Sequence, residues 1–425
     1  MKKLLVALLV LGLAAPAMAA EVALYGSFRT HLGYYDVSED YGGAGVAAAA
    51  QVGGPDMDPT ILSGQGFDDA GTVLSLSGQS RFGAKAKVSD TLNAVFEAGL
   101  LETSRIPSGG PNGNSSQNQD IYLRLAYGTW NFGAGSFMFG KNYTPATYLL
   151  YSNQLGDLGD QGDAIMLVGG ITYAGRQPQL RLTFGGFEIA AIEHNTAPTV
   201  TGLSAAAGTA DDLDFTFPKF EAAYTLNTPM ITVRPAVGWQ TYDTVDRTTG
   251  GSEADESVTS YLGALGLQLR FNPVYINMTG SYTVNAANYG INNFALGIAN
   301  SPALVVPVLN PTGIINVNNA RYVNGDVEDS TLIMATFVVG AKLSPMLKVE
   351  AGMSYSSAEV DLSATASADQ TAYVYYVQAP ITVAPGVTMT PEVGMVDRGD
   401  LAIDGAADAD QGEMMYGIVN FRVDF

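Results

Sequence analysis

The sequence predicts an all-β fold, a transmembrane antiparallel β-barrel of 16 strands, and three observations lead to it. Short segments alternate apolar and polar residues with a period of two, as strands between lipid and water do. Tight turns and long polar connections join these segments in strict alternation. In the last segment, Val419, Phe421, Val423 and the terminal Phe425 share one face of the strand, and Asn420 lies on the opposite face.

The first residues are expected to be a targeting segment outside the fold. Lys2 and Lys3 precede an apolar stretch, residues 4–15, and the small-residue cleavage pattern Ala17-Met18-Ala19, which together make a signal peptide over residues 1–19. An uncleaved anchor helix is the alternative, and the shortness of the apolar stretch argues against it. Residues 20–425 are then expected to form one barrel domain, because no later run reaches the roughly 18 apolar residues of a spanning helix.

Composition narrows the classes of function. Without Lys2 and Lys3 the chain keeps 18 basic and 41 acidic residues, a net charge of −23, which argues against nucleic-acid binding. Only 14% of residues are charged and 47% are hydrophobic, so we expect an apolar wall with the acidic residues concentrated in connections. Cysteine is absent from the sequence, which excludes disulfides and thiolate metal sites.

Sixteen segments satisfy the alternation, and Pro, Gly, Asn and Ser at the seven short joints are ordinary turn residues. The predicted strands are 22–35, 72–88, 92–101, 121–130, 136–141, 171–184, 187–194, 220–226, 231–242, 261–271, 275–285, 332–343, 347–355, 373–381, 387–395 and 415–425. The eight long connections are 36–71, 103–118, 142–168, 195–213, 243–257, 289–329, 359–370 and 397–412. A soluble sandwich or solenoid is the alternative, but a sandwich needs no aromatic terminus and no fixed-period repeat is visible.

Five stretches resemble the general diffusion porins of Gram-negative bacteria. They are Val22-Ala23-Leu24-Tyr25-Gly26, Ser80-Arg81-Phe82-Gly83-Ala84-Lys85, Leu123-Arg124-Leu125-Ala126-Tyr127-Gly128, Phe139-Gly140-Lys141-Asn142-Tyr143-Thr144-Pro145 and the terminal strand. The matches cover mainly the first third and the last dozen residues. The resemblance implies a homotrimer in the outer membrane, among lipid and lipopolysaccharide, with a water-filled barrel narrowed by an inward-folded third loop. It also makes Phe421, Val423 and Phe425 a C-terminal assembly signal.

The resemblance and the strand alternation together predict a constriction. Four basic residues are expected on the inner wall, namely Arg29, Arg81, Lys85 and Arg124. The matching third loop, 142–168, carries three acidic residues, Asp157, Asp160 and Asp163. Opposed charges would orient water across the passage and favour small hydrophilic solutes. The alternatives are hydrated or paired wall arginines and, for the aspartates, a solvated loop tip or a DxxDxxD cation site.

One position departs from the family pattern and leaves the basic wall incompletely defined. The strand after the third loop often carries a further basic residue, and here Thr172 stands at that place. Arg176 and Arg181 lie nearby, but the alternation breaks between residues 175 and 178, so which face they occupy stays open.

The expected function is passive diffusion of small hydrophilic solutes and ions through an outer-membrane channel. Acidic residues in the long connections, such as Asp400, Asp404 and Asp408, predict mild cation selectivity and could bridge divalent cations to lipopolysaccharide. No cofactor, resident metal or enzymatic activity is expected, because His31 and His194 are the only histidines and neither has a nucleophile pattern beside it. A sugar- or anion-specific channel and a non-transporting structural or adhesin barrel are the alternatives.

Overall fold

In the computed structural model, the chain forms one closed antiparallel barrel. The structure describes residues 21–38, 70–77, 79–103, 118–147, 149, 151–156, 170, 172–194, 204–205, 212–245, 247–249, 252–253, 256–291, 299–300, 314–315, 317–323, 326–363, 365–405 and 408–425. The expected signal peptide lies outside the described residues. Among the described residues, no helix combines the length and apolar character needed to cross a bilayer.

The barrel sheet contains 22 strand segments, which make sixteen spans because five spans are interrupted along their length. The first seven spans are β1 (Glu21–Val37), β2 with β3 (Ala70–Leu76, Arg81–Lys87), β4 (Leu92–Thr103), β5 (Asn118–Asn131), β6 (Ser136–Tyr143), β7 (Arg176–Phe184) and β8 (Phe187–Ile192). The next four are β10 with β11 and β12 (Asp212–Asp214, Lys219–Tyr224, Leu226–Asn227), β13 (Ile231–Val245), β16 (Ser257–Arg270) and β17 (Val274–Val284).

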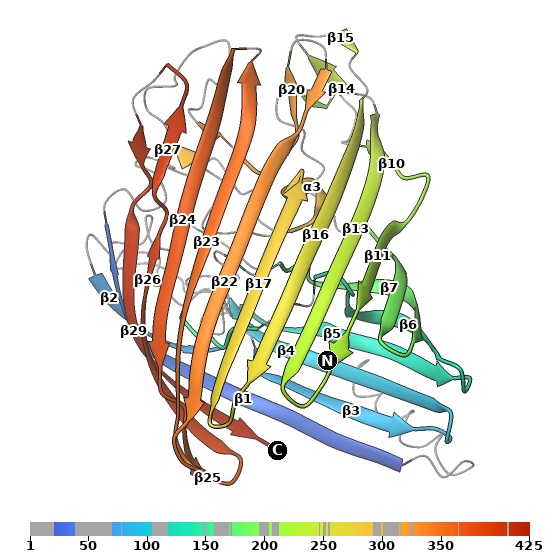
Figure 1. The fold of residues 1–425 in the computed structure, drawn as a ribbon, viewed down its shortest axis with the longest axis vertical. Helices are drawn as coiled ribbons and strands as arrows, with labels where there is room; N and C mark the ends of the chain where they lie inside the picture. The colour runs from blue at the N-terminus through green and yellow to red at the C-terminus, as the bar shows by residue number, and fades with distance from the viewer. Residues whose placement is uncertain are drawn as a thin grey trace.

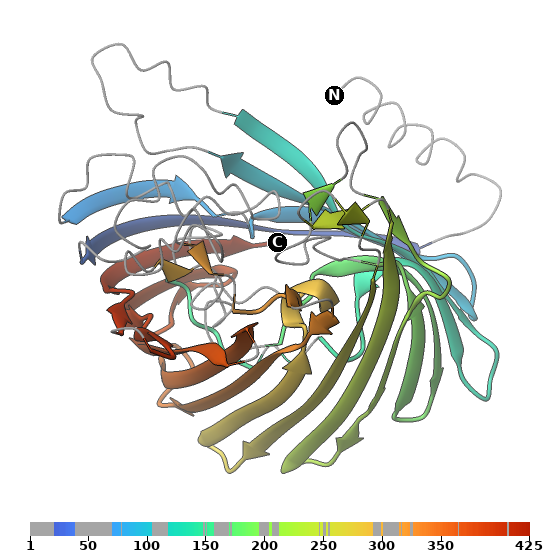
Figure 2. The ribbon, with the colours of Figure 1, turned by 90° about the horizontal axis from the view of Figure 1, so that it is seen from above.

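The last five spans lead back to the first. They are β22 (Ser330–Lys342), β23 (Lys348–Ser363), β24 with β25 (Ala366–Gln378, Ile381–Ala384), β26 with β27 (Val387–Asp397, Asp400–Ile403) and β28 with β29 (Ala409–Asp410, Glu413–Asp424). Closure is made by β1 and β29, which pair antiparallel from Ser27↔Asp424 to Val37↔Met414. Figure 1 shows the tilted strands and Figure 2 the ring they form. The predicted sixteen-stranded antiparallel barrel is therefore confirmed.

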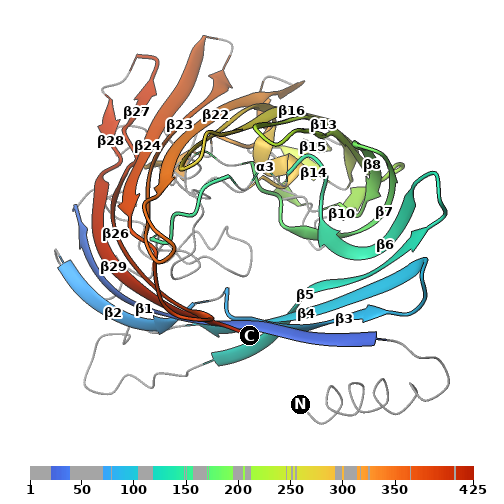
Figure 3. The same ribbon diagram turned by 60° about the horizontal axis from the view of Figure 1, so that its bottom comes forward.

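Short elements lie in the long connections. They are β9 (Ser204–Ala205), β14 (Arg247–Thr249), β15 (Ser252–Glu253), α3 (Ala286–Tyr289), β18 (Ala299–Asn300), β19 (Ile314–Ile315), β20 (Arg321–Val323) and β21 (Asp326–Glu328). The α3 helix lies inside the ring of strands (Figure 3).

The faces of the strands follow the predicted alternation. On β1, Leu24 and Phe28 are exposed on the outer face, whereas Arg29 and His31 are buried on the inner face. On β29, Phe421 is exposed and Asn420 is buried. An apolar face turned outward is the reverse of a soluble protein and is the distribution of a transmembrane barrel.

The sequence was read wrongly at the connection 359–370. Residues 359–363 continue β23 and residues 366–370 begin β24, so most of the predicted connection belongs to the two strands. There Val360 and Leu362 are buried while Glu359 and Asp361 are exposed. The strand continues with polar residues on its outer face, so the alternation persists while the apolar outer face that distinguishes a lipid-facing strand from a loop is missing. The predicted loop 397–412 likewise contains β27 and β28.

Two predicted strands also differ in extent. In the span predicted at 72–88, β2 ends at Leu76 and β3 begins at Arg81, and the amide of Ser80 bonds the carbonyl of Ser77 (2.9 Å). The strand predicted from residue 171 begins only at Arg176, after Gly175, whose φ of 76° breaks the extended backbone. A positive φ at that point suits glycine and coincides with the break in alternation.

Candidate functional site

Three of the four predicted basic residues are brought together on the inner wall around Glu97 of β4. The Nε atom of Arg124 lies 2.8 Å from Oε1 of Glu97, and Nε of Arg81 lies 3.7 Å from its Oε2. Tyr25 donates its hydroxyl to the same Oε2 (3.0 Å). Glu97 is thus the partner that orients both guanidinium groups, and the fixed fork of arginine suits such a contact.

Arg29 completes this cluster from β1. Its Nε donates to Oγ of Ser27 (3.2 Å), and its charge interacts with those of Arg81, Arg124 and Arg422. Arg29 and Arg124 are 7% and 1% exposed, whereas the side chain of Arg81 is 29% exposed. Four guanidinium groups near two carboxylates, Glu97 and Asp424, leave this part of the wall with a net positive charge, which attracts anions.

Lys85 lies at the edge of this cluster. It is exposed, and its Nζ lies 4.9 Å from the centroid of the Tyr25 ring, a cation–π contact. Because Tyr25 bonds Glu97, Lys85 joins the cluster through the ring, and among the described residues it makes no ion pair that would fix its position.

The basic wall continues through Arg176, Arg181 and Arg234. The guanidinium of Arg176 lies 5.4 Å from the centroid of the Tyr143 ring. Nη2 of Arg234 and Nη1 of Arg181 lie 2.9 and 3.8 Å from the same oxygen of Glu188. The sequence left the facing of the first two open and missed Arg234, which lies on the inner face of β13 between Val233 and Pro235.

The connection between β6 and β7, which we call the third connection, lies against the inner wall in its described residues. The amide of Ala146 donates to Oε2 of Glu221 on β11 (2.7 Å), and Nη2 of Arg234 donates to the carbonyl of Pro145 (2.9 Å). Further along, Nδ2 of Asn277 on β17 donates to the carbonyl of Tyr151 (2.8 Å). The chain therefore follows the interior from β11 to β17.

Two buried glutamates hold the next residues of the third connection. Glu350 of β23 accepts bonds from the amide and Nδ2 of Asn153 (3.2 and 2.7 Å). Glu392 of β26 accepts bonds from the amides of Leu155 and Gly156 (2.9 and 2.7 Å). Both carboxylates are acceptors for backbone groups that the barrel interior would otherwise leave unpaired. Sequence reasoning missed them, although each occupies an inward-facing position in the alternation of its strand.

The predicted acidic residues Asp157, Asp160 and Asp163 lie outside the described residues. The described chain ends at Gly156 and resumes at Gly170, whose carbonyl accepts a bond from Thr336 (2.8 Å). Both ends of this stretch contact the inner wall. Its role as the acidic side of a constriction stays a prediction.

The terminal residues of the predicted assembly signal face outward. Phe421, Val423 and Phe425 are exposed. The Phe425 ring lies 5.3 Å from that of Phe28, and the backbone of Phe425 exchanges two hydrogen bonds with Gly26 (2.8 and 3.1 Å). The last residue therefore takes part in closing the barrel.

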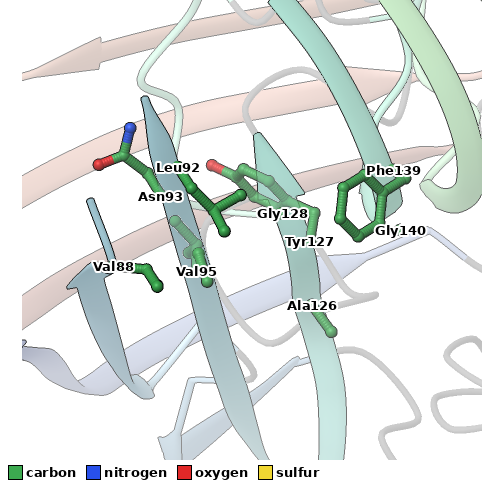
Figure 4. A pocket seen from close by; sticks show the side chains of 10 residues that line it. Val88, Leu92, Asn93, Val95, Ala126, Tyr127, Gly128, Phe139 and Gly140 are labelled. Atoms are coloured by element: carbon green, nitrogen blue, oxygen red, sulfur yellow. The ribbon is translucent and has the colours of Figure 1, made fainter. Parts of the chain in front are cut away.

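Other candidate chemistry is sparse in the described part of the chain. His31 contacts Asn420 (3.0 Å), and His194 stacks on Phe215 (3.8 Å between centroids). Among the described residues, no group of three or more His, Asp or Glu is placed to hold a metal ion. An open hollow of about 430 Å³ over β4, β5 and β6 is lined by uncharged residues (Figure 4). Its apolar lining does not suit a hydrophilic solute.

Comparison with known proteins finds similarity in structure alone. No family model and no curated sequence matches the chain. The outer membrane channel DcaP of Acinetobacter baumannii aligns with a TM-score of 0.60 at 14% identity, over 97% of this chain and 99% of that one. An anion-selective porin from Comamonas acidovorans aligns with a TM-score of 0.53 at 14% identity, over 96% and 100%.

Salmonella typhi OmpF, in complex with daunomycin, aligns with a TM-score of 0.53 at 12% identity, over 95% of this chain and 97% of that one. All three cover nearly the whole of both chains, so the likeness extends to the complete barrel. The chain has the sixteen-stranded barrel fold of Gram-negative outer-membrane porins.

Proposed function

We propose that the protein is an outer-membrane porin, a channel for passive diffusion of small hydrophilic solutes and ions, and not an enzyme. The observation that carries this proposal is the arrangement of the interior. An arginine wall spans β1 to β13, and the described residues 145–156 of the third connection contact inner-wall groups from β11 to β26. The fold and the apolar exterior support an outer-membrane location in contact with lipid and lipopolysaccharide. Cleavage after Ala19 and assembly as a homotrimer belong to the same proposal.

Selectivity is the finer part of the proposal. The last long connection carries four exposed acidic residues, Asp400, Asp404, Asp408 and Asp410. A negatively charged channel entrance concentrates cations within about 8–10 Å. We propose mild cation selectivity from this charge, opposed by the inner arginines. Arg29, Arg81, Lys85 and Arg124 would face Asp157, Asp160 and Asp163 across the passage.

A second candidate is an anion-specific channel. The specific observation in its favour is the number of basic groups: six arginines (Arg29, Arg81, Arg124, Arg176, Arg181 and Arg234) lie on the inner wall, where Glu97 pairs with Arg81 and Arg124 and Glu188 pairs with Arg181 and Arg234. Such a wall would bind carboxylate or phosphate groups by forked hydrogen bonds.

Single-channel conductance of the refolded protein in planar bilayers, with the reversal potential under a salt gradient, tests these proposals. Current steps in groups of three with a cation-favouring reversal potential support the trimeric porin. Arg124→Ala should then change both the conductance and the reversal potential. An anion-favouring potential with block by a dicarboxylate supports the second candidate. Folded barrels without current would refute a channel and favour a structural or adhesin barrel.

A further inference from the structure

A second long connection enters the barrel interior. The connection between β17 and β22, which we call the sixth connection, has two described stretches there, residues 285–291 with α3 and residues 317–323. Ala286, Tyr289 and Val317 are each 0% exposed and belong to one apolar cluster with inward-facing Val360 and other strand residues. Figures 2 and 3 show α3 within the ring of strands. The sixth connection therefore fills interior space beside the third.

Polar side chains of the inner wall fix the position of α3. Nε2 of Gln240 donates to the carbonyl of Asn288 (2.8 Å), and Nδ2 of Asn288 donates to the hydroxyl of Tyr242 (2.9 Å). Nζ of Lys219 donates to the carbonyl of Tyr289 (3.1 Å) and lies 4.3 Å from the centroid of its ring. These bonds join α3 to β11 and β13.

Glu221 is bonded to both connections at once. Its Oε2 accepts the amide of Ala146 from the third connection (2.7 Å), and its Oε1 accepts the hydroxyl of Tyr289 from the sixth (2.9 Å). Lys219 supplies the counter-charge, with Nζ 3.9 Å from Oε1. Lys219 and Glu221 are 0% and 1% exposed, so protein groups and not water satisfy this buried pair.

The backbone opposite Glu221 is shaped for this contact. Gly238 of β13 pairs with Glu221 in the sheet register, and a Cβ added there would lie 1.8 Å from the hydroxyl oxygen of Tyr289. Any larger residue would displace the tyrosine from the wall. Gly238 therefore leaves space for the Tyr289 hydroxyl, and Glu221 on the neighbouring strand accepts its hydrogen bond.

We propose that Glu221 is a positioning residue of the channel. Its carboxylate holds the third and sixth connections together against β11, and the two connections jointly set the largest solute that passes. This inference rests on the proposed channel function. The size limit of a pore follows from its narrowest lining, and one side chain bonded to both connections keeps that lining narrow. In Glu221→Gln, an amide nitrogen replaces one acceptor oxygen and Lys219 loses its counter-charge, so we expect the two connections to be held less tightly against β11.

The test compares solute size with ion conductance. Glu221→Gln and Gly238→Ala are refolded into vesicles, and swelling rates are measured with sugars from mono- to tetrasaccharide, alongside conductance in planar bilayers. We expect the ratio of large-sugar to small-sugar rates to rise several-fold in both variants, more than the conductance does. Glu359→Gln, the same change at an exposed position of β23, is the matched control and should keep the wild-type ratio.

Tyr289→Phe provides the test should the loss of a buried charge prevent folding. It removes only the hydroxyl bonded to Glu221, and we expect a smaller rise in the same ratio. An unchanged ratio in the folded variants would overturn the inference while leaving the channel in place. A wild-type barrel that passes neither ions nor sugars would instead overturn the proposed function, and the inference with it.

Discussion

The ion pairs of Glu97 offer a quantitative test of the inner wall. In Glu97→Gln, the guanidinium of Arg124 stays buried and loses the carboxylate that lies 2.8 Å from its Nε. Removing one partner of a buried pair costs about 3–5 kcal/mol. The more exposed contact with Arg81, at 3.7 Å, adds at most about 1 kcal/mol. We therefore expect the free energy of unfolding to fall by about 3–6 kcal/mol.

Urea titration of the barrel in phospholipid vesicles measures this change, with Trp130 and Trp239 as fluorescent reporters in the strands. Arg124→Met is the companion variant, because it removes the buried charge. If the cost arises from an unpaired charge, the double variant should be more stable than Glu97→Gln alone. A loss below about 1 kcal/mol in Glu97→Gln, or a double variant less stable than both single variants, would refute the reasoning.

Three further predictions concern other parts of the barrel. Phe425→Ala removes the ring beside Phe28 and should lower the yield of folded barrel, measured as heat-modifiable mobility on gels. Gly156→Ala places a Cβ 1.9 Å from the Tyr416 ring, so it should move the third connection away from Glu392 and change the conductance, whereas Gly263→Ala, with open space at its Cβ, should not. Asp404 accepts hydrogen bonds from the amide and the hydroxyl of Ser367, and these bonds lower the pKa of Asp404 below the ordinary 3.8. The contact should therefore be present at higher pH and be lost only as the pH falls through the lowered pKa. Amide exchange of Ser367 measures this loss, and Asp404→Asn should remove the pH dependence.

The predicted constriction shows which features of the site can be predicted from the alternation of residues. Alternation places a side chain inside or outside, so Arg29, Arg81 and Arg124 could be assigned to the inner wall from the sequence. Their shared partner Glu97 could not be identified from the sequence. Glu97 lies on another strand, and the residues of a single segment do not determine its register with the neighbouring strand. The same holds for Glu188, which joins Arg181 to Arg234 across β7, β8 and β13.

The sequence by itself determined the number of strands, their faces and the inside-out character of the barrel, because each depends on local alternation and on turn residues between neighbouring segments. Only the tertiary structure decided what occupies the interior. Glu350 and Glu392 meet residues 153–156 across about 200 or more positions of chain, and Glu221 meets Ala146 and Tyr289 from opposite directions. Such contacts depend on where a long connection folds back, and closure of the ring sets that position.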